Sequence, residues 1–304
     1  MASAVMTAPR QILPGTTYLF TRRCLQRQYL LRPSAEVNQL FGFLLSIAAE
    51  RFRVEIHAFC VMSNHFHLIL TDTEARLPDF AKFLDSLVAR AMNALLGCDE
   101  YFWGSPTYSA VALQQPADVI AKIAYVLANP VEAGLVRHGR KWPGLWSAPG
   151  QMGATTLLFK RPAPFFRKKG ETALPEEARL TLSIPRGFEP VEFRREVGAA
   201  LAAREQTLAA ELAEAGREFI GVERVLAQSP FGRPTTAEPR GGLNPRVACR
   251  DQFRRMEALS RLVAFLDDHR RAFERWRAGA RDVVFPAGTY LMRVLHGAAC
   301  AAPG

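Results

Sequence analysis

Two histidines separated by one residue lie in an apolar stretch that is typical of a buried β-strand. Residues 61–72 read VMSNHFHLILTD, and the histidines are His65 and His67. Successive side chains of a strand point to opposite faces, so these imidazoles share one face and lie about 6–7 Å apart along it, where they can bind one cation. The alternative is that both are ordinary polar residues on a half-exposed sheet. On the preceding strand, His57 is expected to be structural and to face away from Cys60.

A second set of polar side chains occupies one face of a helix predicted at residues 116–130. Apolar residues recur there at helical spacing, whereas Lys122, Tyr125 and Asn129 follow one another on a different face. Beside a histidine pair, a carboxamide can complete a metal site, the metal can polarise a phosphoryl oxygen, and the phenol can attack phosphorus. The lysine can help to neutralise charge in the transition state. The alternative is a solvated helix face.

The elements that must position these residues follow from hydrophobic periodicity and turn signals. Strands are expected where β-branched residues dominate, and helices where apolar residues recur every three or four positions. The predicted strands begin near residue 16 and cover residues 53–62, 65–71 and 107–113, and the predicted helices cover residues 34–52, 77–97 and 116–130. The order β-α-β-β-α-β plus a helix predicts an α+β, ferredoxin-like fold, in which an antiparallel sheet carries its helices on one face.

Composition divides the chain into three parts. The ferredoxin-like domain is expected at residues 1–158, and residues 159–188, rich in basic residues and prolines, are predicted to form a linker or an arm. Residues 189–304 are predicted to form a mostly α-helical C-terminal domain. Within it, residues 217–236 (REFIGVERVLAQSPFGRPTT) have the Gly/Pro spacing of a helix-turn-helix, which would make this domain DNA-binding. The alternative is a helical scaffold for dimerisation or for bracing the first domain.

The overall composition favours a polyanionic partner and a reducing compartment. The chain has 304 residues and a formal net charge of +10, and a basic protein of this size favours nucleic acid first and an anionic membrane second. Five cysteines without a CxxC pair indicate neither a disulfide framework nor a cysteine metal site. The start has no signal-peptide pattern, and no apolar run reaches the roughly 20 residues of a membrane helix. We therefore expect a cytoplasmic, nucleoid-associated protein with no membrane partner.

Three segments of the chain resemble those of a known family. VMSNHFHLIL resembles the HUH motif of single-tyrosine transposases, in which two histidines flank a hydrophobic residue. YVLANPVEAGLV (residues 125–136), followed by GLWS (residues 144–147), resembles the tyrosine-bearing segment of their REP-associated branch, and YLFTRRCLQRQYLL resembles its first strand. The motifs stand in the family's order over about residues 16–150. The chain is therefore similar to REP-associated tyrosine transposases.

This resemblance implies an HUH endonuclease-type fold and a defined chemistry. Such enzymes cleave single-stranded DNA, often beside an imperfect hairpin, form a 5′-phosphotyrosine link and release a 3′-hydroxyl. By position in the motifs, Tyr125 would be the nucleophile, and His65, His67 and Asn129 would hold one Mg²⁺ or Mn²⁺ ion. Family members include monomers and dimers, so either state is expected.

The chain departs from the family pattern at two positions. Ser63 stands where many relatives have proline, and because it is a turn position we expect little effect. Glu132 stands where a basic residue is common, which removes a positive charge near the site.

Basic residues outside the two motifs are candidate DNA contacts. The residues assigned to this role are Arg22, Arg23, Arg27, Lys122, Lys168 and Lys169. The two last lysines lie near Phe165 and Phe166, and basic residues interleaved with aromatic ones suit single-stranded nucleic acid. The alternatives are a solvated strand edge for the arginines and a plain linker for the lysines.

Two other functions remain open. One is a domesticated relative of the transposases that binds structured DNA or RNA but no longer cleaves it. The other is a metal-dependent phosphoesterase that forms no covalent intermediate.

Overall fold

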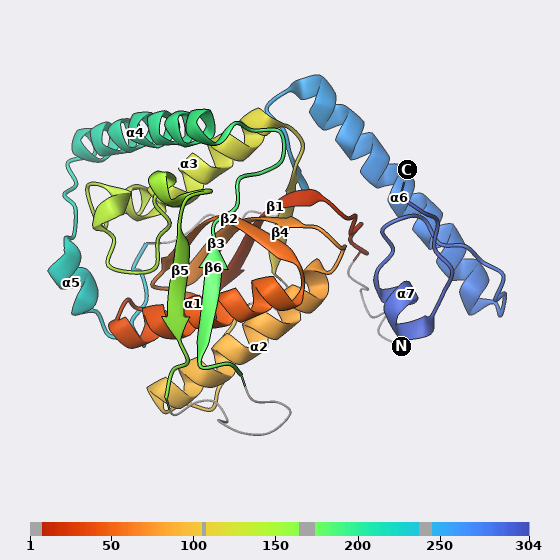
Figure 1. The fold of residues 1–304 in the computed structure, drawn as a ribbon, viewed down its shortest axis with the longest axis horizontal. Coiled ribbons are helices and arrows are strands. Elements are labelled where there is room, and N and C mark those ends of the chain that lie inside the picture. Colours follow the sequence, from red (N-terminus) through yellow and green to blue (C-terminus); the bar gives the residue numbers. More distant parts are fainter. Residues whose placement is uncertain (1–7, 105–107, 164–173, 237–244, 304) are drawn as a thin grey trace.

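The structure, a computed structural model, describes residues 8–104, 108–163, 174–236 and 245–303 and is built around a five-stranded sheet (Figure 1). The strand order is β2-β3-β1-β4-β7. The strands are β1 (Thr16–Arg23), β2 (Val54–Met62), β3 (His65–Asp72), β4 (Ser109–Leu113) and β7 (Val247–Ala248). The first four pair antiparallel in ferredoxin-like order, and β7 pairs parallel with β4. The predicted α+β, ferredoxin-like class is confirmed.

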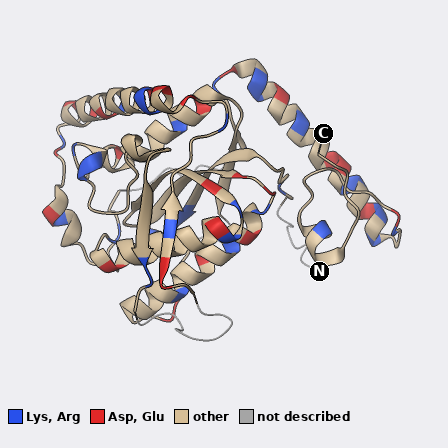
Figure 2. Ribbon diagram, viewed as in Figure 1, with Lys and Arg blue, Asp and Glu red and all other residues tan. Residues whose placement is uncertain are grey.

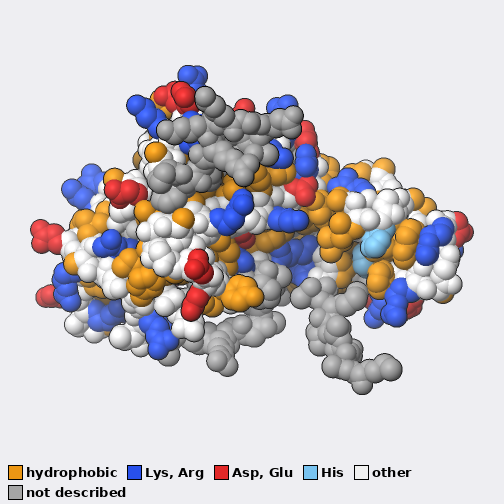
Figure 3. Space-filling view, turned by 90° about the horizontal axis from the view of Figure 1, so that it is seen from below, with side chains coloured by type: hydrophobic (Ala, Val, Ile, Leu, Met, Phe, Trp, Pro, Cys, Tyr) orange, Lys and Arg blue, Asp and Glu red, His pale blue; other side chains and the backbone are white. Residues whose placement is uncertain are grey.

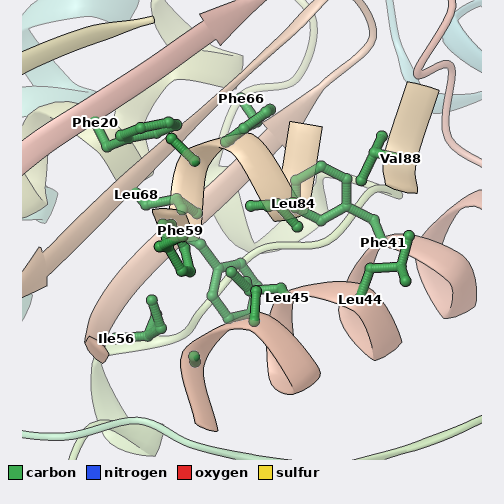
Figure 4. Packing of buried hydrophobic residues seen from close by; sticks show 14 of the residues in the cluster. Phe20, Phe41, Leu44, Leu45, Ile56, Phe59, Phe66, Leu68, Leu84 and Val88 are labelled. Atoms are coloured by element: carbon green, nitrogen blue, oxygen red, sulfur yellow. The ribbon is translucent and has the colours of Figure 1, made fainter. Parts of the chain in front are cut away.

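Two helices, α1 (Ala35–Arg51) and α2 (Leu77–Leu96), cover one face of this sheet. The hydroxyl of Ser34 accepts a hydrogen bond from the backbone of Val37 and caps α1, while Gly97 ends α2 at a positive φ of 67°. Figure 4 shows the core between helices and sheet, which contains the fully buried side chains Phe20, Phe41, Phe59, Phe66, Leu44, Leu45, Leu68 and Leu84. Burying each such side chain contributes roughly 1.5–3 kcal/mol, so this face is the main source of stability.

The opposite face is covered by α3 (Pro116–Glu132), and α4 (Pro190–Glu214) forms a further layer over that helix (Figure 1), so the prediction that the helices all lie on one face is wrong. Ile123 and Leu127 of α3 pack on Ile69 of the sheet, and α4 packs on α3. Pro130 lies inside α3, which ends two residues later than predicted. A proline this near the end disturbs only the last turn.

The segment that follows α3 holds this helix against the sheet. The indole N–H of Trp146 donates to the carbonyl of Leu127 in α3 at 2.9 Å. On either side of it, Leu145 accepts from Val61 and Ser147 donates to Phe59, which pairs the segment with the outer edge of β2. The GLWS motif therefore ties the tyrosine-bearing helix to the strand next to the histidines.

β2 contains an irregularity at His57. Its pairing register with β3 shifts between Ile56 and Ala58, which leaves His57 as an extra residue. His57 is completely buried, and its ring nitrogens hydrogen-bond the hydroxyl of Thr71 at 2.8 Å and the carbonyl of Ser183 at 2.9 Å. The shift turns His57 onto the same face as Cys60, contrary to the simple alternation expected from the sequence.

The predicted linker at residues 159–188 contains ordered strands. β5 (Thr156–Lys160) and β6 (Glu177–Thr181) form an antiparallel hairpin that packs on α1. A Cβ atom on Gly42 of α1 would lie 2.1 Å from the ring of Phe159, so only glycine permits this approach. The hairpin buries Leu180 in the main core. The linker prediction is wrong for the described part of this segment.

The last part of the chain lies to one side of the sheet (Figure 1). It contains α6 (Gln252–Arg277) and α7 (Leu291–His296), with a small apolar cluster of its own around Phe285. The short helix α5 (Val222–Leu226) lies at the opposite end of the molecule (Figure 1), where Val225 is buried in the same core as Ile123 and Leu127 of α3. Short 3-10 turns elsewhere in the fold are η1 (Leu25–Arg27), η2 (Gly139–Lys141) and η3 (Pro149–Gln151). α5 has only five residues and no helix follows in residues 227–236, so the predicted helix-turn-helix is not formed there.

The surface of the C-terminal helices is mixed in character. Figure 2 shows basic and acidic residues alternating along α6, and i,i+3 pairs such as Arg270–Asp267 account for several of them. Apolar side chains remain exposed over this part of the molecule in Figure 3, and Leu291 and Leu295 of α7 are among the exposed residues. Among the described residues, no helix has the length and the apolar composition needed to cross a bilayer.

Candidate active site

The two histidines lie side by side on the face of β3 that α3 covers. The ring centroids of His65 and His67 are 4.8 Å apart, with the rings nearly perpendicular. His67 is buried and 4 % exposed, whereas His65 at the start of the strand is half-buried. The shared face predicted from strand alternation is therefore correct, and the pair lies at the end of the sheet.

Hydrogen bonds to the Nδ1 atoms orient both imidazoles. Asn64 donates through Nδ2 to the carbonyl of Arg27 at 3.1 Å, so its Oδ1 faces His65 and accepts from Nδ1 at 2.7 Å. This places the lone pair of His65 on Nε2. The hydroxyl of Thr21 on β1 hydrogen-bonds Nδ1 of His67 at 2.7 Å. Such partners of Nδ1 are the usual support of a metal-binding histidine.

Tyr125 and Asn129 of α3 meet the histidine pair. The ring of Tyr125 lies 5.7 Å from that of His67, in an edge-on arrangement. Asn129 donates through Nδ2 to the backbone carbonyl of Tyr125 at 2.9 Å, and its side chain lies close enough to influence the pKa values of His67 and Tyr125. The structure thus brings the four predicted site residues together through one hydrogen bond and two ring contacts.

The surroundings set the protonation of the site. Burial, together with the nearby charges of His65 and Arg23, holds the pKa of His67 well below its ordinary value, so this imidazole is neutral at physiological pH. A neutral imidazole is the form that binds metal. Burial also raises the pKa of Tyr125, and the carboxylate of Glu132 acts in the same direction. The phenol is therefore protonated until a cation or a substrate stabilises its anion.

Two cations lie over the Tyr125 ring. Nζ of Lys122 is 5.4 Å from the ring centroid, and the guanidinium of Arg204 on α4 is 5.1 Å from it. Arg204 also forms a 3.1 Å ion pair with Glu132. The acidic residue that the sequence placed near the site is thus neutralised by a basic residue from a different helix.

The predicted DNA-contacting arginines of the β1 region have different surroundings. Arg23 is exposed on the histidine face, where it pairs in register with His65. Arg22 points to the other face, is only 8 % exposed and forms a 3.0 Å ion pair with Asp85, and its contact with DNA stays a prediction. Arg27 donates to the carbonyl of Thr236 at 2.6 Å and joins η1 to the segment after α5.

The remaining basic candidates are Lys122, Lys168 and Lys169. Lys122 lies beside Tyr125 as described, and its contact with DNA stays a prediction. Lys168 and Lys169, with Phe165 and Phe166, lie outside the described residues.

The donor set fits a divalent cation with open coordination positions. It consists of the two imidazoles of His65 and His67 and the amide oxygen of Asn129. Within the described ranges, no three His, Cys, Asp or Glu side chains gather into a further candidate site. Two nitrogen donors suit Mn²⁺ better than Mg²⁺, which prefers oxygen ligands.

Sequence reasoning missed three residues that surround the site. Thr21 and Asn64 support the histidines, and Arg204 lies over the nucleophile candidate. Thr21 is signalled by strand alternation once the pairing of β1 with β3 is known, and Asn64 by its place next to His65. Arg204 carries no signal in the sequence, because its position depends on how α4 packs.

Comparisons with known proteins give matches among solved structures. No family model and no curated protein matches the chain. Among solved structures, the chain is similar to a REP-associated tyrosine transposase bound to a REP hairpin, with 21 % identity and a TM-score of 0.39 over 46 % of this chain and 81 % of that one. It is also similar to a candidate transposase from Deinococcus radiodurans R1, with 25 % identity and a TM-score of 0.28 over 35 % of this chain and 85 % of that one. Both neighbours are described as transposases.

Proposed function

We propose that this protein is a metal-dependent, transposase-type DNA strand transferase that nicks single-stranded or hairpin DNA through a 5′-phosphotyrosine intermediate. One observation carries the proposal: the ring of Tyr125 lies 5.7 Å from that of His67, which is itself 4.8 Å from the ring of His65. A nucleophile candidate and a metal-ligand set therefore meet at one point. The HUH-like motif and the tyrosine-bearing segment of the sequence support the same conclusion.

In the proposed reaction, the phenol oxygen of Tyr125 attacks the phosphorus of a phosphodiester. A bond forms between phosphorus and the tyrosine oxygen, the bond from phosphorus to the 3′ oxygen breaks, and the tyrosine retains the 5′ phosphate. The phenol proton is lost and the departing 3′ oxygen gains a proton, so the net charge is conserved. A divalent ion held by His65, His67 and Asn129 would polarise a phosphoryl oxygen. Attack by the released 3′-hydroxyl or by another one reverses the step without ATP.

The protein's own residues prepare Tyr125 for this attack. Asn129 fixes its own amide through the backbone carbonyl of Tyr125, and its side chain lowers the pKa of the phenol. Arg204 lies over the ring and favours the phenolate, as does Arg23. Lys122 lies beside the same ring and is placed to neutralise a phosphate oxygen.

A cleavage assay on single-stranded DNA flanked by a hairpin, with Mn²⁺, tests the proposal. We expect wild-type protein to yield a covalent protein–DNA adduct that is stable to denaturant, and Tyr125→Phe to yield none. Tyr290→Phe is the matched control, because Tyr290 packs in the core on the other face of the sheet from the histidines. An adduct in the Tyr125→Phe variant would overturn the assignment.

The same assay separates the two other functions. DNA binding that EDTA leaves unchanged, with no adduct in any divalent metal, would indicate a non-cleaving module. Metal-dependent hydrolysis without an adduct would indicate a phosphoesterase.

A further inference from the structure

A second site lies on the opposite face of the sheet from the histidines. A hollow of about 760 Å³ is bounded on one side by α2 and on the other by residues 100–104. Lys82, Asp85 and Arg90 of α2 line one wall, and Tyr101 and Trp103 line the other. None of these side chains contributes to the histidine site.

The backbone brings this hollow to the same end of the sheet as the histidines. The N–H of Gly104 donates to the carbonyl of Arg23, the last residue of β1, and the N–H of Leu25 donates to Phe102. Arg23 in turn pairs in register with His65. The hollow and the histidines thus lie at the same end of the sheet, on opposite faces.

The hollow offers aromatic surface to a planar ligand. Tyr101 is 87 % exposed, which is unusual for a side chain of this size. Trp103 is half-buried, and its indole N–H donates to the backbone carbonyl of Asp85 at 2.9 Å, which fixes the plane of the ring. Nucleic-acid bases stack on such rings, and stacking is the main sequence-tolerant contribution to single-strand binding.

Asp85 supplies an acceptor that nothing in the described chain satisfies. Its Oδ2 forms the ion pair with Arg22, but its Oδ1 is buried and has no hydrogen-bond partner. Burial raises the pKa of Asp85 to about 7, although Arg22 acts in the opposite direction. A buried carboxylate oxygen without a donor is unfavourable, and the exocyclic amino group of a base is a donor of the kind that carboxylates accept.

We propose that this hollow binds one unpaired nucleotide of the DNA substrate, with its base against Tyr101 and Trp103 and its exocyclic amino group on Oδ1 of Asp85. The proposal rests on the proposed function for its choice of a nucleic acid. It adds a specificity: adenine, cytosine and guanine carry an exocyclic amino group and thymine does not. The exposed cations Lys82 and Arg90 flank the opening and are placed to contact the neighbouring phosphates.

Binding of short labelled oligonucleotides to the full-length protein in EDTA tests the pocket without cleavage. Fluorescence anisotropy with dA6, dC6 and dT6 gives the three affinities. We expect dA6 and dC6 to bind several-fold more tightly than dT6. Tyr101→Ala should weaken binding of dA6 and dC6 by about 10-fold, because it removes a stacking surface. Phe253→Ala is the matched control, since Phe253 is equally exposed, at 86 %, but lies on α6.

A second variant tests the base preference. Asp85→Asn keeps the shape of the side chain but adds a donor, so the preference for dA6 and dC6 over dT6 should disappear while Tyr101 still contributes. The proposal that the hollow binds a nucleotide would be contradicted by any of three results. These are unchanged binding by Tyr101→Ala, equal binding of the three oligonucleotides by wild type, and no binding at all. The cleavage assay tests the proposed function independently. If wild type forms no covalent adduct but shows the expected oligonucleotide preference, strand transfer is contradicted and nucleotide binding in the hollow is supported.

Discussion

Arg204 of α4 and Glu132 of α3 form a 3.1 Å ion pair beside the ring of Tyr125. The two charges act on the phenol in opposite directions. Glu132 raises the pKa of Tyr125 and Arg204 lowers it, while burial makes the largest contribution and raises it. The acidity of the proposed nucleophile therefore depends on a contact between two helices that lie far apart in the sequence.

Substitutions of this pair should move the pH dependence of adduct formation in opposite directions. Glu132→Gln removes a charge that disfavours the phenolate, so the rise in cleavage rate should occur at lower pH than in wild type. Arg204→Gln should move that rise to higher pH. The measurement is the single-turnover rate of adduct formation across pH with saturating Mn²⁺.

The control for these variants is Glu192→Gln. Glu192 forms a comparable 3.1 Å ion pair with Arg195 on the exposed side of α4 and should leave the profile unchanged. Shifts of the same sign in Glu132→Gln and Arg204→Gln would show that the pair acts through packing instead of through charge.

Metal affinity should depend on the hydroxyl of Thr21. Thr21→Val keeps the β-branched shape but removes the partner of Nδ1 in His67, and loss of such a contact typically weakens metal binding about 10- to 100-fold. A calorimetric titration of wild type and variant with Mn²⁺ measures the change in metal affinity.

Thr17→Val is the matched control for this titration. Thr17 lies on the same strand and face, but its hydroxyl bonds that of Thr71 at 2.7 Å. Equal Mn²⁺ affinities for the two variants would contradict the orienting role of Thr21.

Packing of α4 on α3 should be essential to the fold of the first domain. Phe193 is 1 % exposed in the core on the histidine face, and its ring lies 4.8 Å from that of Phe188. Phe193→Ala should lower the free energy of unfolding by about 3–5 kcal/mol. Val191→Ala, at a position 65 % exposed on the same helix, should change it by less than about 0.5 kcal/mol. Urea denaturation measures both changes. A small effect of Phe193→Ala would contradict this role and indicate that α4 belongs to a separate domain.

His57 should make stability fall as the solution becomes acidic. Burial lowers its pKa from the ordinary value of 6.5 to about 4, so the folded protein holds this imidazole neutral while the unfolded chain protonates it first. The contribution of neutral His57 to the free energy of unfolding is complete above about pH 6.5 and is lost progressively as the pH falls toward 4. At about 1.36 kcal/mol per pKa unit the loss is roughly 3 kcal/mol.

Comparison with a variant that cannot titrate isolates this contribution. Urea unfolding of wild type and His57→Gln at several pH values between about 4 and 7 should show their difference in stability changing with pH in the direction given above. A difference that is constant across this range would contradict the assignment.

The elements that position the site follow from local patterns in the sequence. Strand alternation predicts the shared face of His65 and His67, and helical spacing predicts that Tyr125 and Asn129 lie together. Both are local properties that depend only on the period of the backbone, and the structure confirms both. The order of strands follows from the ferredoxin-like pattern, because few topologies connect these elements without crossing.

The structure departs from what the sequence alone indicates where long-range packing overrides composition. Arg22 and Arg23 look alike in sequence, but only the direction of β1 decides that Arg22 is buried against Asp85 while Arg23 is exposed. The basic, proline-containing segment at residues 159–188 has the composition of a linker. Its residues Phe159 and Leu180 are nevertheless buried in the main core, where Phe159 packs on Gly42 of α1. The bulge at His57 has no signature in the sequence, and it reverses the face of a single residue.

The most direct test of the account is to locate the covalent link. Wild-type protein is incubated with hairpin-flanked single-stranded DNA and Mn²⁺, the adduct is digested with protease and nuclease, and the modified peptide is sequenced by mass spectrometry. The account predicts a nucleotide 5′-phosphate on the oxygen of Tyr125. A nucleotide on any other residue, or strand cleavage that leaves the protein unmodified, would contradict it.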